Sequence, residues 1–421
     1  MKIVDSSNTR AVNALIDRRP GRDAGVYRRV ARIVERVRRD GDRALVEYAK
    51  RFDGRVPPLE LPRQEIEARA STVTREVRTA LRTAARNIRR VARRQVPREW
   101  SVSTAPGVTI TQRVLPLDRV GCYVPGGRYP LPSSLLMSAI PARAAGVKQV
   151  IAICPTADPV VLAAAHEAGV DRFFQVGGAH GVAALAYGTR TIPRVDKIVG
   201  PGSAYVAAAK QLVSGDCAID FFAGPSEIAI VSTEGRPDWI AADLIAQAEH
   251  DPHARALLIT PARALARAVV REIGKQLPAH GPARLALARN GGAIVTASLD
   301  EAIVLAQRLA PEHLVCDSLA VSRRLTRAGT VFVGDFSAQA AGDYVTGSNH
   351  ILPTAGSAAA RGGLSAADFV RVSTLQRVSG SGFRRIAPAG IALAEAEGLS
   401  GHAQSLRVRL QQPGATERDN D

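Results

Sequence analysis

The sequence predicts an α/β protein built on parallel sheets with helices on both faces. From about residue 107 onwards, short runs of aliphatic residues alternate with alanine-rich segments of helical character. Strands that alternate with helices in this way form parallel sheets. Three of the junctions carry glycines between strand and helix, which is typical of nucleotide-type domains. With 421 residues, the chain is long enough for about two or three domains with cores of their own.

Residues 1 to about 100 are expected to be mostly helical, with turns at Asp40-Gly41 and Asp53-Gly54. Much of the net charge of +17 lies here. In YRRVARIVERVRRDGDRALVEYAKRF, arginines alternate with apolar residues at helical spacing, and acidic residues are interleaved. This pattern indicates the solvated faces of amphipathic helices, because a nucleic-acid groove would combine clustered charge with aromatic residues. Aromatics make up only 4% of the chain, so we expect no nucleic-acid partner.

The strands expected after residue 107 are short apolar runs separated mostly by helical segments. In order they are GVTITQRVLPL, RVGCYV, KQVIAIC, RFFQV, KIV, EIAIVS, ALLIT, AIVT, HLVC and TVFVG. The last fifty or so residues are expected to be helical again and to end in a polar tail, QQPGATERDND.

Three strand–glycine–helix junctions lie close together: VGCYVPGGRYPLPSSLLMSAI, FFQVGGAHGVAALAYG and KIVGPGSAYVAAAKQLV. Backbone N–H groups at the start of a helix attract anions, and glycine lets the backbone approach a ligand closely. Tyr205 stands where a dinucleotide fingerprint needs its third glycine, so the standard G-x-G-x-x-G motif is absent. The junctions fit either a nucleotide-type domain or ordinary tight turns between strand and helix.

Composition also bears on the compartment. The four cysteines, Cys122, Cys154, Cys217 and Cys316, form no C-x-x-C pair, so neither a disulfide framework nor a cysteine zinc site is predicted. We expect no signal peptide and no membrane span, because no apolar run reaches about 18 residues. The expectation is therefore a cytoplasmic protein without a membrane partner. Cys316 is expected to be a small buried residue, with a thiol mechanism as the alternative.

The stretch LIAQAEHDPHARALLI places a polar side chain where an apolar one belongs. Gln247 lies on the same helical face as Ile240 and Leu244, and a primary amide buried without partners costs roughly 1–3 kcal/mol. His250 follows three residues later, close to the helix end expected before Pro252. Two interpretations are open. Either main-chain groups form hydrogen bonds with the amide and the helix dipole favours the histidine, or the two side chains belong to a functional site.

Further segments combine histidine with an acid. They are Glu312-His313, Asp343 with His350, and Glu397 with His402. Imidazole and carboxylate groups suit a borderline metal such as zinc. The neighbouring side chains of Glu312 and His313 diverge, which favours two separate proton-handling roles. Spacing does not show that these segments converge, so the residues by themselves indicate a metal-assisted α/β enzyme with possible nucleotide use.

The same segments resemble histidinol dehydrogenase from about residue 22 to 408. The matching runs are GCYVPGG, LPSSLLMSAIPARAAGV, VGGAHGVAALAYGT, VDKIVGPG, AGPSE, DLIAQAEHDP, APEHL, AGDYVTGSNHILPT, GGLSAADFVR and EGLSGHA. The resemblance implies a four-electron oxidation of L-histidinol through L-histidinaldehyde to L-histidine, the last step of histidine biosynthesis. It implies two NAD⁺ per turnover and a zinc ion.

The resemblance implies roles for individual residues. The implied zinc ligands are Gln247, His250, Asp343 and His402. His313 would take the alcohol proton as hydride leaves, and Glu312 would activate water against the aldehyde. The implied substrate contacts are Ser226, Gln247, His250, His313, Asp343, His350, Glu397 and His402. The implied NAD contacts are Tyr123, His180 and Ser203.

The resemblance also implies two doubly wound, incomplete Rossmann-like domains with helical N-terminal and C-terminal segments, in an intertwined homodimer. The expected parts are an N-terminal segment (1–21), a discontinuous first α/β domain with the metal and catalytic residues (22–122 and 227–363), a second α/β domain with the nucleotide-binding loops (123–226), and a C-terminal helical segment with a polar tail (364–421). Glu397 and His402 would then act in the partner's site.

Two positions of the implied NAD site depart from the family's pattern. His180 stands where the family usually has Gln, and Ser203 stands where it has Asn. Both replacements stay polar, although His180 can titrate. The run Arg128-Tyr129-Pro130-Leu131 departs as well. These changes leave open an alternative, a zinc and NAD dehydrogenase on the same scaffold that acts on a different polar primary alcohol.

Overall fold

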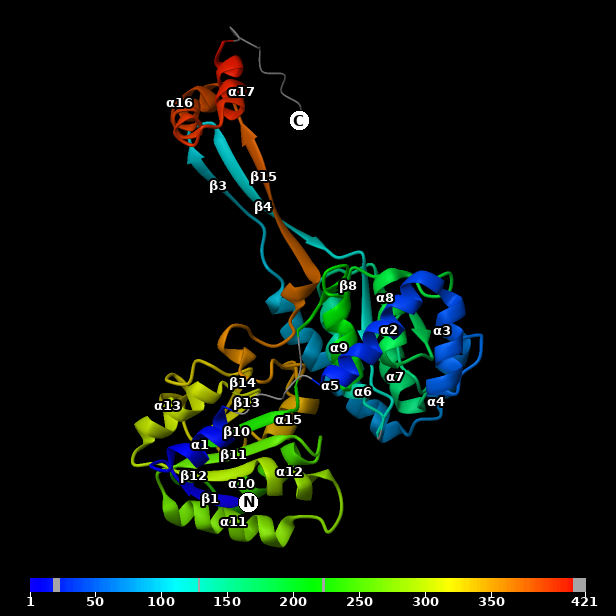
Figure 1. Ribbon diagram of the computed structural model, residues 1–421, viewed down its shortest axis with the longest axis vertical. Helices are drawn as coiled ribbons and strands as arrows, with labels where there is room; N and C mark the ends of the chain where they lie inside the picture. The colour runs from blue at the N-terminus through cyan, green and yellow to red at the C-terminus, as the bar shows by residue number, and fades with distance from the viewer. Residues whose placement is uncertain (18–22, 128, 222–223, 412–421) are drawn as a thin grey trace. The chain divides into compact units, whose positions relative to one another are not determined.

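The computed structural model describes residues 1–17, 23–127, 129–221 and 224–411. It has the predicted α/β architecture with parallel sheets (Figure 1). The chain divides into two compact units, a larger one of Met1–Gln95 and Leu117–Phe369 and a smaller one of Val96–Pro116 and Val370–Asp421. Within the described ranges, no helix combines the length and apolar character needed to cross a bilayer.

One sheet of the larger unit, sheet A, is parallel throughout. Its strands in spatial order are β1 (Lys2–Asp5), β12 (Gly291–Val295), β11 (Arg255–Thr260), β10 (Glu227–Val231), β13 (His313–Cys316) and β14 (Thr330–Val333). The chain order runs outward from β10 to both sides, so a topological switch point lies between β10 and β13. Every residue of β10 and β11 is buried, as expected for strands covered on both faces.

Helices cover both faces of sheet A (Figure 1). One face packs against α10 (Pro237–Ala248), α11 (Arg263–Gln276) and α12 (Pro282–Asn290). The other face packs against α1 (Thr9–Ile16) and α13 (Leu299–Leu309). Shorter elements follow the last strands: α14 (Leu319–Ser322), α15 (Gln339–Tyr344), and the 3₁₀ turns η2 (Ser357–Ala359) and η3 (Ala366–Phe369).

The other sheet of the larger unit, sheet B, has the order β2 (Glu60–Leu61), β7 (Arg172–Phe174), β6 (Gln149–Ile153), β5 (Arg119–Tyr123), β8 (Lys197–Val199) and β9 (Ala218–Ile219). Only the β2–β7 pair is antiparallel. One face shares a core with α2 (Ala24–Asp40), α3 (Asp42–Tyr48), the π-helix η1 (Ala49–Asp53), α8 (Gly178–Tyr187) and α9 (Ala204–Val213). The remaining helices pack on one another: α4 (Arg63–Ser71), α5 (Arg75–Gln95), α6 (Pro132–Ala144) and α7 (Pro159–Ala168).

The packing differs from the expected domain boundaries. The expected first domain includes residues 22–122, but α2 packs against α8 and α9 of sheet B. Its apolar stripe of Val30, Val34 and Val37 is almost fully buried there. The expected separate segment 1–21 contains β1, which pairs in parallel with β12. Local patterns show that a helix has an apolar face, but they do not show which sheet that face covers. The expected boundary at residues 21 and 22 lies outside the described residues.

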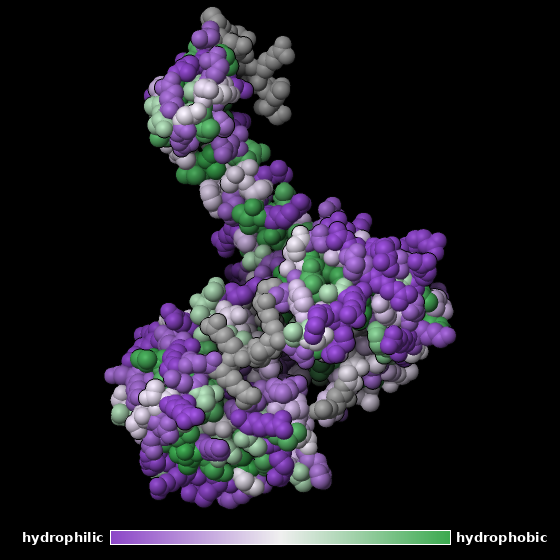
Figure 2. Space-filling model, in the orientation of Figure 1, coloured by the Kyte–Doolittle hydropathy of each residue, from purple (hydrophilic) through white to green (hydrophobic). Residues whose placement is uncertain are grey.

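The smaller unit contains sheet C, an antiparallel sheet of β15 (Val370–Val378), β4 (Val108–Pro116) and β3 (Trp100–Ala105), and the helices α16 (Gly380–Ala396) and α17 (Ser400–Leu410). The expected helical segment 364–421 is therefore wrong over β15, which pairs along its whole length with β4. Figure 2 shows hydrophobic side chains on the surface of this unit. The tail from residue 412 lies outside the described part of the chain.

Candidate active site

The two expected catalytic residues lie at the amino end of one strand of sheet A, beside the amino end of a neighbouring strand. Glu312 directly precedes β13, and His313 is the first residue of that strand. Ser226 directly precedes β10, and Glu227 is its first residue. The parallel register pairs Ile228 of β10 with His313. The sheet itself therefore brings the segments around residues 226 and 312 together, although 85 positions separate Glu227 from Glu312.

The main chain of Glu227 holds both expected catalytic side chains. Its N–H donates to Oε2 of Glu312 at 2.9 Å, and its carbonyl oxygen lies 3.2 Å from Nδ1 of His313. Because a carbonyl only accepts hydrogen bonds, Nδ1 carries the hydrogen, and Nε2 of the neutral ring is left to accept a proton. The role of Glu227 is not predictable from the sequence, since a role exercised through the main chain leaves no signal in residue type.

Asp343 on α15 faces the same imidazole. Its Oδ1 lies 3.5 Å from Nε2 of His313, and its Oδ2 accepts a hydrogen bond from the side-chain amide of Gln339. Nδ1 of His350 lies 2.8 Å from the main-chain oxygen of Asp343, and Nε2 of His350 lies 3.4 Å from Oγ of Ser134. The structure thus joins the expected residues 313, 343 and 350. Gln339 was missed, although its i, i+4 spacing to Asp343 was a usable signal.

Burial and charge shift the pKa values of this site in different directions. Burial raises the pKa of Glu312 above its usual value, and it raises that of Glu227 to about 7. Burial lowers the pKa of His313, but the carboxylates of Glu312 and Asp343 outweigh it, so the pKa is raised. A raised pKa makes a group a stronger base than it is in water. Glu312 and His313 are therefore two proton acceptors at one place, each fixed separately.

Gln247 and His250 lie at the carboxyl end of α10, which ends at Ala248. Gln247 is fully buried, and neither Oε1 nor Nε2 of its amide has a hydrogen-bond partner. The alternative in which main-chain groups form hydrogen bonds with this amide is therefore wrong. His250 is exposed just beyond the helix. Burial raises the pKa of Asp343, but the hydrogen bond to His313 and the charge of that ring outweigh it, with a small contribution from His250, so the pKa is lowered. Because α10 packs against α15, the amide of Gln247 and the carboxylate of Asp343 come from contacting helices, and the imidazole of His250 follows the first of these helices.

These side chains fit a divalent metal because one of the oxygen atoms that could ligate it has no other partner. Burial removes water from the side-chain oxygen of Gln247 without providing a hydrogen bond, which is unfavourable, and a bound cation would be the missing partner. In the described ranges, no three His, Cys, Asp or Glu side chains form a group that could hold a metal. The expected set has one imidazole and one carboxylate in the larger unit. Its other imidazole, His402, is exposed on α17 of the smaller unit, as is Glu397 at the end of α16.

The expected NAD contacts lie around the carboxyl ends of β5 and β8 in sheet B. Tyr123 ends β5, and its Oη accepts the N–H of Gly178 at 3.3 Å. His180 is buried on the first turn of α8, with Nε2 2.9 Å from Oδ2 of Asp53. Ser203 is exposed at the start of α9. His180 is thus engaged by a carboxylate rather than directed outward. The departure at Arg128 lies outside the described residues.

Glycine is required where the loop after β8 meets Tyr123. Gly200 has a φ of +115°, and a Cβ there would lie 2.2 Å from the carbonyl oxygen of Tyr123. The close approach seats the loop before Ser203 directly on the end of β5. The three expected strand–glycine–helix junctions are all present, before α6, α8 and α9.

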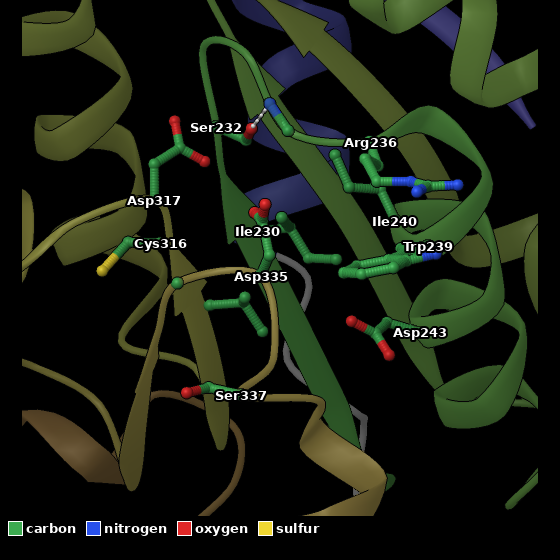
Figure 3. Close-up of a pocket in the computed structure, with 13 residues that line it drawn as sticks. Ile230, Ser232, Arg236, Trp239, Ile240, Asp243, Cys316, Asp317, Asp335 and Ser337 are labelled. Atoms are coloured by element: carbon green, nitrogen blue, oxygen red, sulfur yellow. Dashed lines mark hydrogen bonds between the residues drawn. The ribbon is translucent and has the colours of Figure 1, made fainter.

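Cys316 lies at the carboxyl end of β13 in sheet A, opposite the amino end that carries His313. It ends β13, whereas His313 begins that strand, so about three residue steps of roughly 3.3 Å separate them. A small pocket of about 30 Å³ lies at this carboxyl edge (Figure 3), which is room for about one water. In the figure the sulfur of Cys316 points away from Asp243. Cys316 is buried, as expected, and burial raises the pKa of its thiol, so it takes no part in the site at His313.

Two sheets with the strand order of a doubly wound fold, one carrying a buried carboxyl–imidazole pair, place the chain among α/β enzymes with Rossmann-like sheets. The sequence model of the histidinol dehydrogenase family matches residues 17–410. The histidinol dehydrogenase of Methylococcus capsulatus is 46% identical over 404 residues, 92% of each chain, and that of Cereibacter sphaeroides is 47% identical over 396 residues, 90% of this chain and 91% of the relative. The crystal structure of histidinol dehydrogenase from Elizabethkingia anophelis covers 98% of both chains with a TM-score of 0.92 and 32% identity. The chain belongs to the histidinol dehydrogenase family of oxidoreductases.

Proposed function

We propose that the chain oxidises L-histidinol to L-histidine through L-histidinaldehyde, with NAD⁺ as hydride acceptor and zinc as the bound metal. The observation that carries this proposal is the Glu312–His313 pair, in which two basic groups are fixed separately by one residue's main chain. Conversion of an alcohol to an acid needs two different proton transfers, one from the alcohol and one from water. Family membership supplies the substrate.

The two groups take these roles in sequence. Nε2 of His313 would accept the hydroxyl proton as the carbon that bears this hydroxyl gives up a hydride, which leaves the aldehyde; NAD⁺ would supply the hydride acceptor. Glu312 then accepts a proton from the water that adds to the aldehyde, and a second hydride transfer gives the carboxylic acid. The hydrogen bond from Nδ1 to the carbonyl of Glu227 keeps the imidazole in the tautomer that the first step needs.

Zinc would be held by Gln247, His250, Asp343 and His402. Bound there, the metal would supply a template that orients the substrate. The orphaned amide of Gln247 supports this ligand set. Ser226, His350 and Glu397 are proposed as further substrate contacts. The NAD⁺ contacts are proposed at Tyr123, His180 and Ser203, and His180 would have to release Asp53 to take part.

A homodimer would complete the site. The smaller unit exposes large apolar side chains, among them Val372 at 53% and Leu393 at 66% of their surface. Apolar surface of this kind is typical of an interface, and a second copy of the chain is the proposed partner. Glu397 and His402, exposed on the same unit, would then serve the partner's site. The four cysteines are free, which fits a reducing cytoplasm.

Steady-state assays test the substrate. The purified protein with zinc and NAD⁺ should form NADH from L-histidinol, and mass spectrometry should identify histidine as the product. A chelator should abolish the activity and zinc should restore it. Other polar primary alcohols are assayed in parallel. Turnover of one of them without any turnover of histidinol would reject the proposal in favour of the different-substrate alternative.

A further inference from the structure

A buried ion pair of the larger unit contacts the loop that follows β8. Lys210 on α9 pairs with Asp220, which directly follows β9. Only 5% of the lysine side chain and 1% of the aspartate side chain are exposed. A buried ion pair is weak evidence for stability, because the cost of removing two charges from water can exceed the gain from their attraction. The hydrogen bonds of the pair indicate a different role.

Both members of the pair bind the main chain of Gly200. Oδ2 of Asp220 accepts the N–H of Gly200 at 2.8 Å, and Nζ of Lys210 donates to the carbonyl oxygen of Gly200 at 3.0 Å. Gly200 is buried and lies one residue beyond the end of β8. Buried main-chain groups without partners are unfavourable. The ion pair supplies both partners, and it thereby fixes the peptide groups on the two sides of Gly200.

Further contacts hold this arrangement in place. Oδ1 of Asp220 accepts the N–H of Phe221 at 2.7 Å, and the main-chain oxygen of Asp220 accepts Nη1 of Arg361 at 2.5 Å. On its other side, Gly200 lies so close to β5 that an added Cβ would be 2.2 Å from the carbonyl oxygen of Tyr123. Gly200 is therefore fixed between the end of β5 and an anchored ion pair.

Ser203 follows three residues later and is the exposed N-cap residue of α9. A serine at this position commonly accepts an N–H of the first helical turn. Among the described residues, the side chain of Ser203 forms no such bond, so its hydroxyl is left for a ligand. Pro201 restricts the main chain between the two residues. The position of the Ser203 hydroxyl therefore depends on where Gly200 is held.

We propose that Lys210 and Asp220 are positioning residues for NAD⁺ binding, which act through Gly200 to hold Ser203 beside the end of β5. The inference rests on the proposed use of NAD⁺ and on Ser203 as one of its contacts. The two side chains are buried behind the loop, so they act through it. A loop that is held before binding spares the entropic cost of ordering it, so the pair increases the affinity for NAD⁺.

Isothermal titration of NAD⁺ into the full chain tests this assignment, with Lys210→Met and Asp220→Asn combined in one variant. Removing both charges leaves neither buried alone. Asparagine still accepts the N–H of Gly200, but methionine offers its carbonyl no donor. The melting temperature should stay within about 5 °C of the unmodified chain. The Kd for NAD⁺ should rise about tenfold, roughly the cost of ordering one residue. The KM for NAD⁺ should rise more than the KM for histidinol, whose proposed contacts lie outside this loop.

Arg172→Met combined with Glu60→Gln is the matched control. These two residues form another ion pair of sheet B, between β7 and β2, with Nε of Arg172 2.7 Å from Oε1 of Glu60. The control should bind NAD⁺ within about twofold of the unmodified chain, because its pair does not contact Gly200. An unchanged Kd in the folded Lys210 and Asp220 variant would overturn the assignment, as would an equal rise in the control.

Hydrogen exchange resolved to single residues gives an independent result on the unmodified chain. The amide of Gly200 should be protected before NAD⁺ is added, because Asp220 already accepts its hydrogen. NAD⁺ should then slow exchange at Ser203 and the first turn of α9. Rapid exchange of the Gly200 amide in the free chain contradicts the assignment. Intact NAD⁺ binding and histidinol oxidation with an unchanged Kd in the variant reject only the positioning role, and an unmodified chain that binds no NAD⁺ rejects the proposed function.

Discussion

Replacing Gln247 by methionine should stabilise the metal-free protein while weakening its response to zinc. The amide is fully buried, and both of its polar atoms lack partners. A buried polar group without a partner costs about 1–3 kcal/mol. Methionine has similar length and no strong hydrogen-bonding group, so Gln247→Met should raise the free energy of unfolding by about that amount. Most core substitutions of a natural residue have the opposite sign.

Zinc should reduce this advantage. At a zinc concentration 100 times its Kd, binding stabilises the folded protein by about 2.7 kcal/mol. If loss of the Gln247 oxygen weakens binding 100-fold, the same concentration stabilises the variant by only about 0.4 kcal/mol. The variant's net advantage should therefore fall by about 2 kcal/mol when zinc is added.

Urea unfolding followed by circular dichroism, in a chelator and in zinc, measures both quantities. Gln64→Met serves as the control, because Gln64 is exposed and such surface changes stay within about 0.5 kcal/mol. The reasoning fails if Gln247→Met destabilises the metal-free protein, or if its zinc response equals that of the unmodified chain.

Three further predictions concern catalysis, pH and assembly. His313→Ala should lower turnover by roughly 10²–10⁴-fold, because the alcohol proton loses its acceptor. Glu312→Gln should slow aldehyde oxidation more than alcohol oxidation. If a rapid-mixing assay shows that Glu312→Gln slows both steps equally, the proposed roles are contradicted. Burial raises the pKa of Asp243 from 3.8 to about 6, so the folded state binds more protons between these values and the free energy of unfolding falls as pH rises through them. Asp243→Asn should match the unmodified chain below about pH 4 and exceed it by roughly 2–3 kcal/mol at pH 7, and a constant difference across pH in urea titrations would refute the assignment. Mixing inactive His313→Ala and His402→Ala chains should restore partial activity if sites are shared, and inactivity of verified mixed dimers would argue against sharing.

The buried strands were the most predictable part of the fold. EIAIV and its neighbours in sheet A are continuous apolar runs because helices cover both faces of the sheet, and every expected run from RVGCYV to TVFVG contains a strand. β15 and β3 escaped prediction because their residues are mostly exposed, so they lack an apolar run. The docking of α2 on sheet B escaped as well, because it depends on long-range packing.

The candidate site also has features that the sequence predicts and features that it does not. Helical periodicity placed Gln247 on an apolar face, and the structure buries it completely. Periodicity did not show that its amide would lack partners, since that depends on α15, nearly a hundred residues away. Glu227 acts through its main chain, and Asp53 contacts His180 from the end of the distant π-helix η1. Such contacts are fixed by strand register and packing, and no residue pattern within one segment contains them.

The yield of NADH per histidine formed tests the two-step account most directly. With zinc-loaded protein, L-histidinol and excess NAD⁺, quantitative product analysis should give two NADH for each histidine and no accumulated aldehyde, because the proposed mechanism uses Glu312 and His313 for successive oxidations in one place. A single NADH with aldehyde released into solution, or no NADH at all, would contradict it.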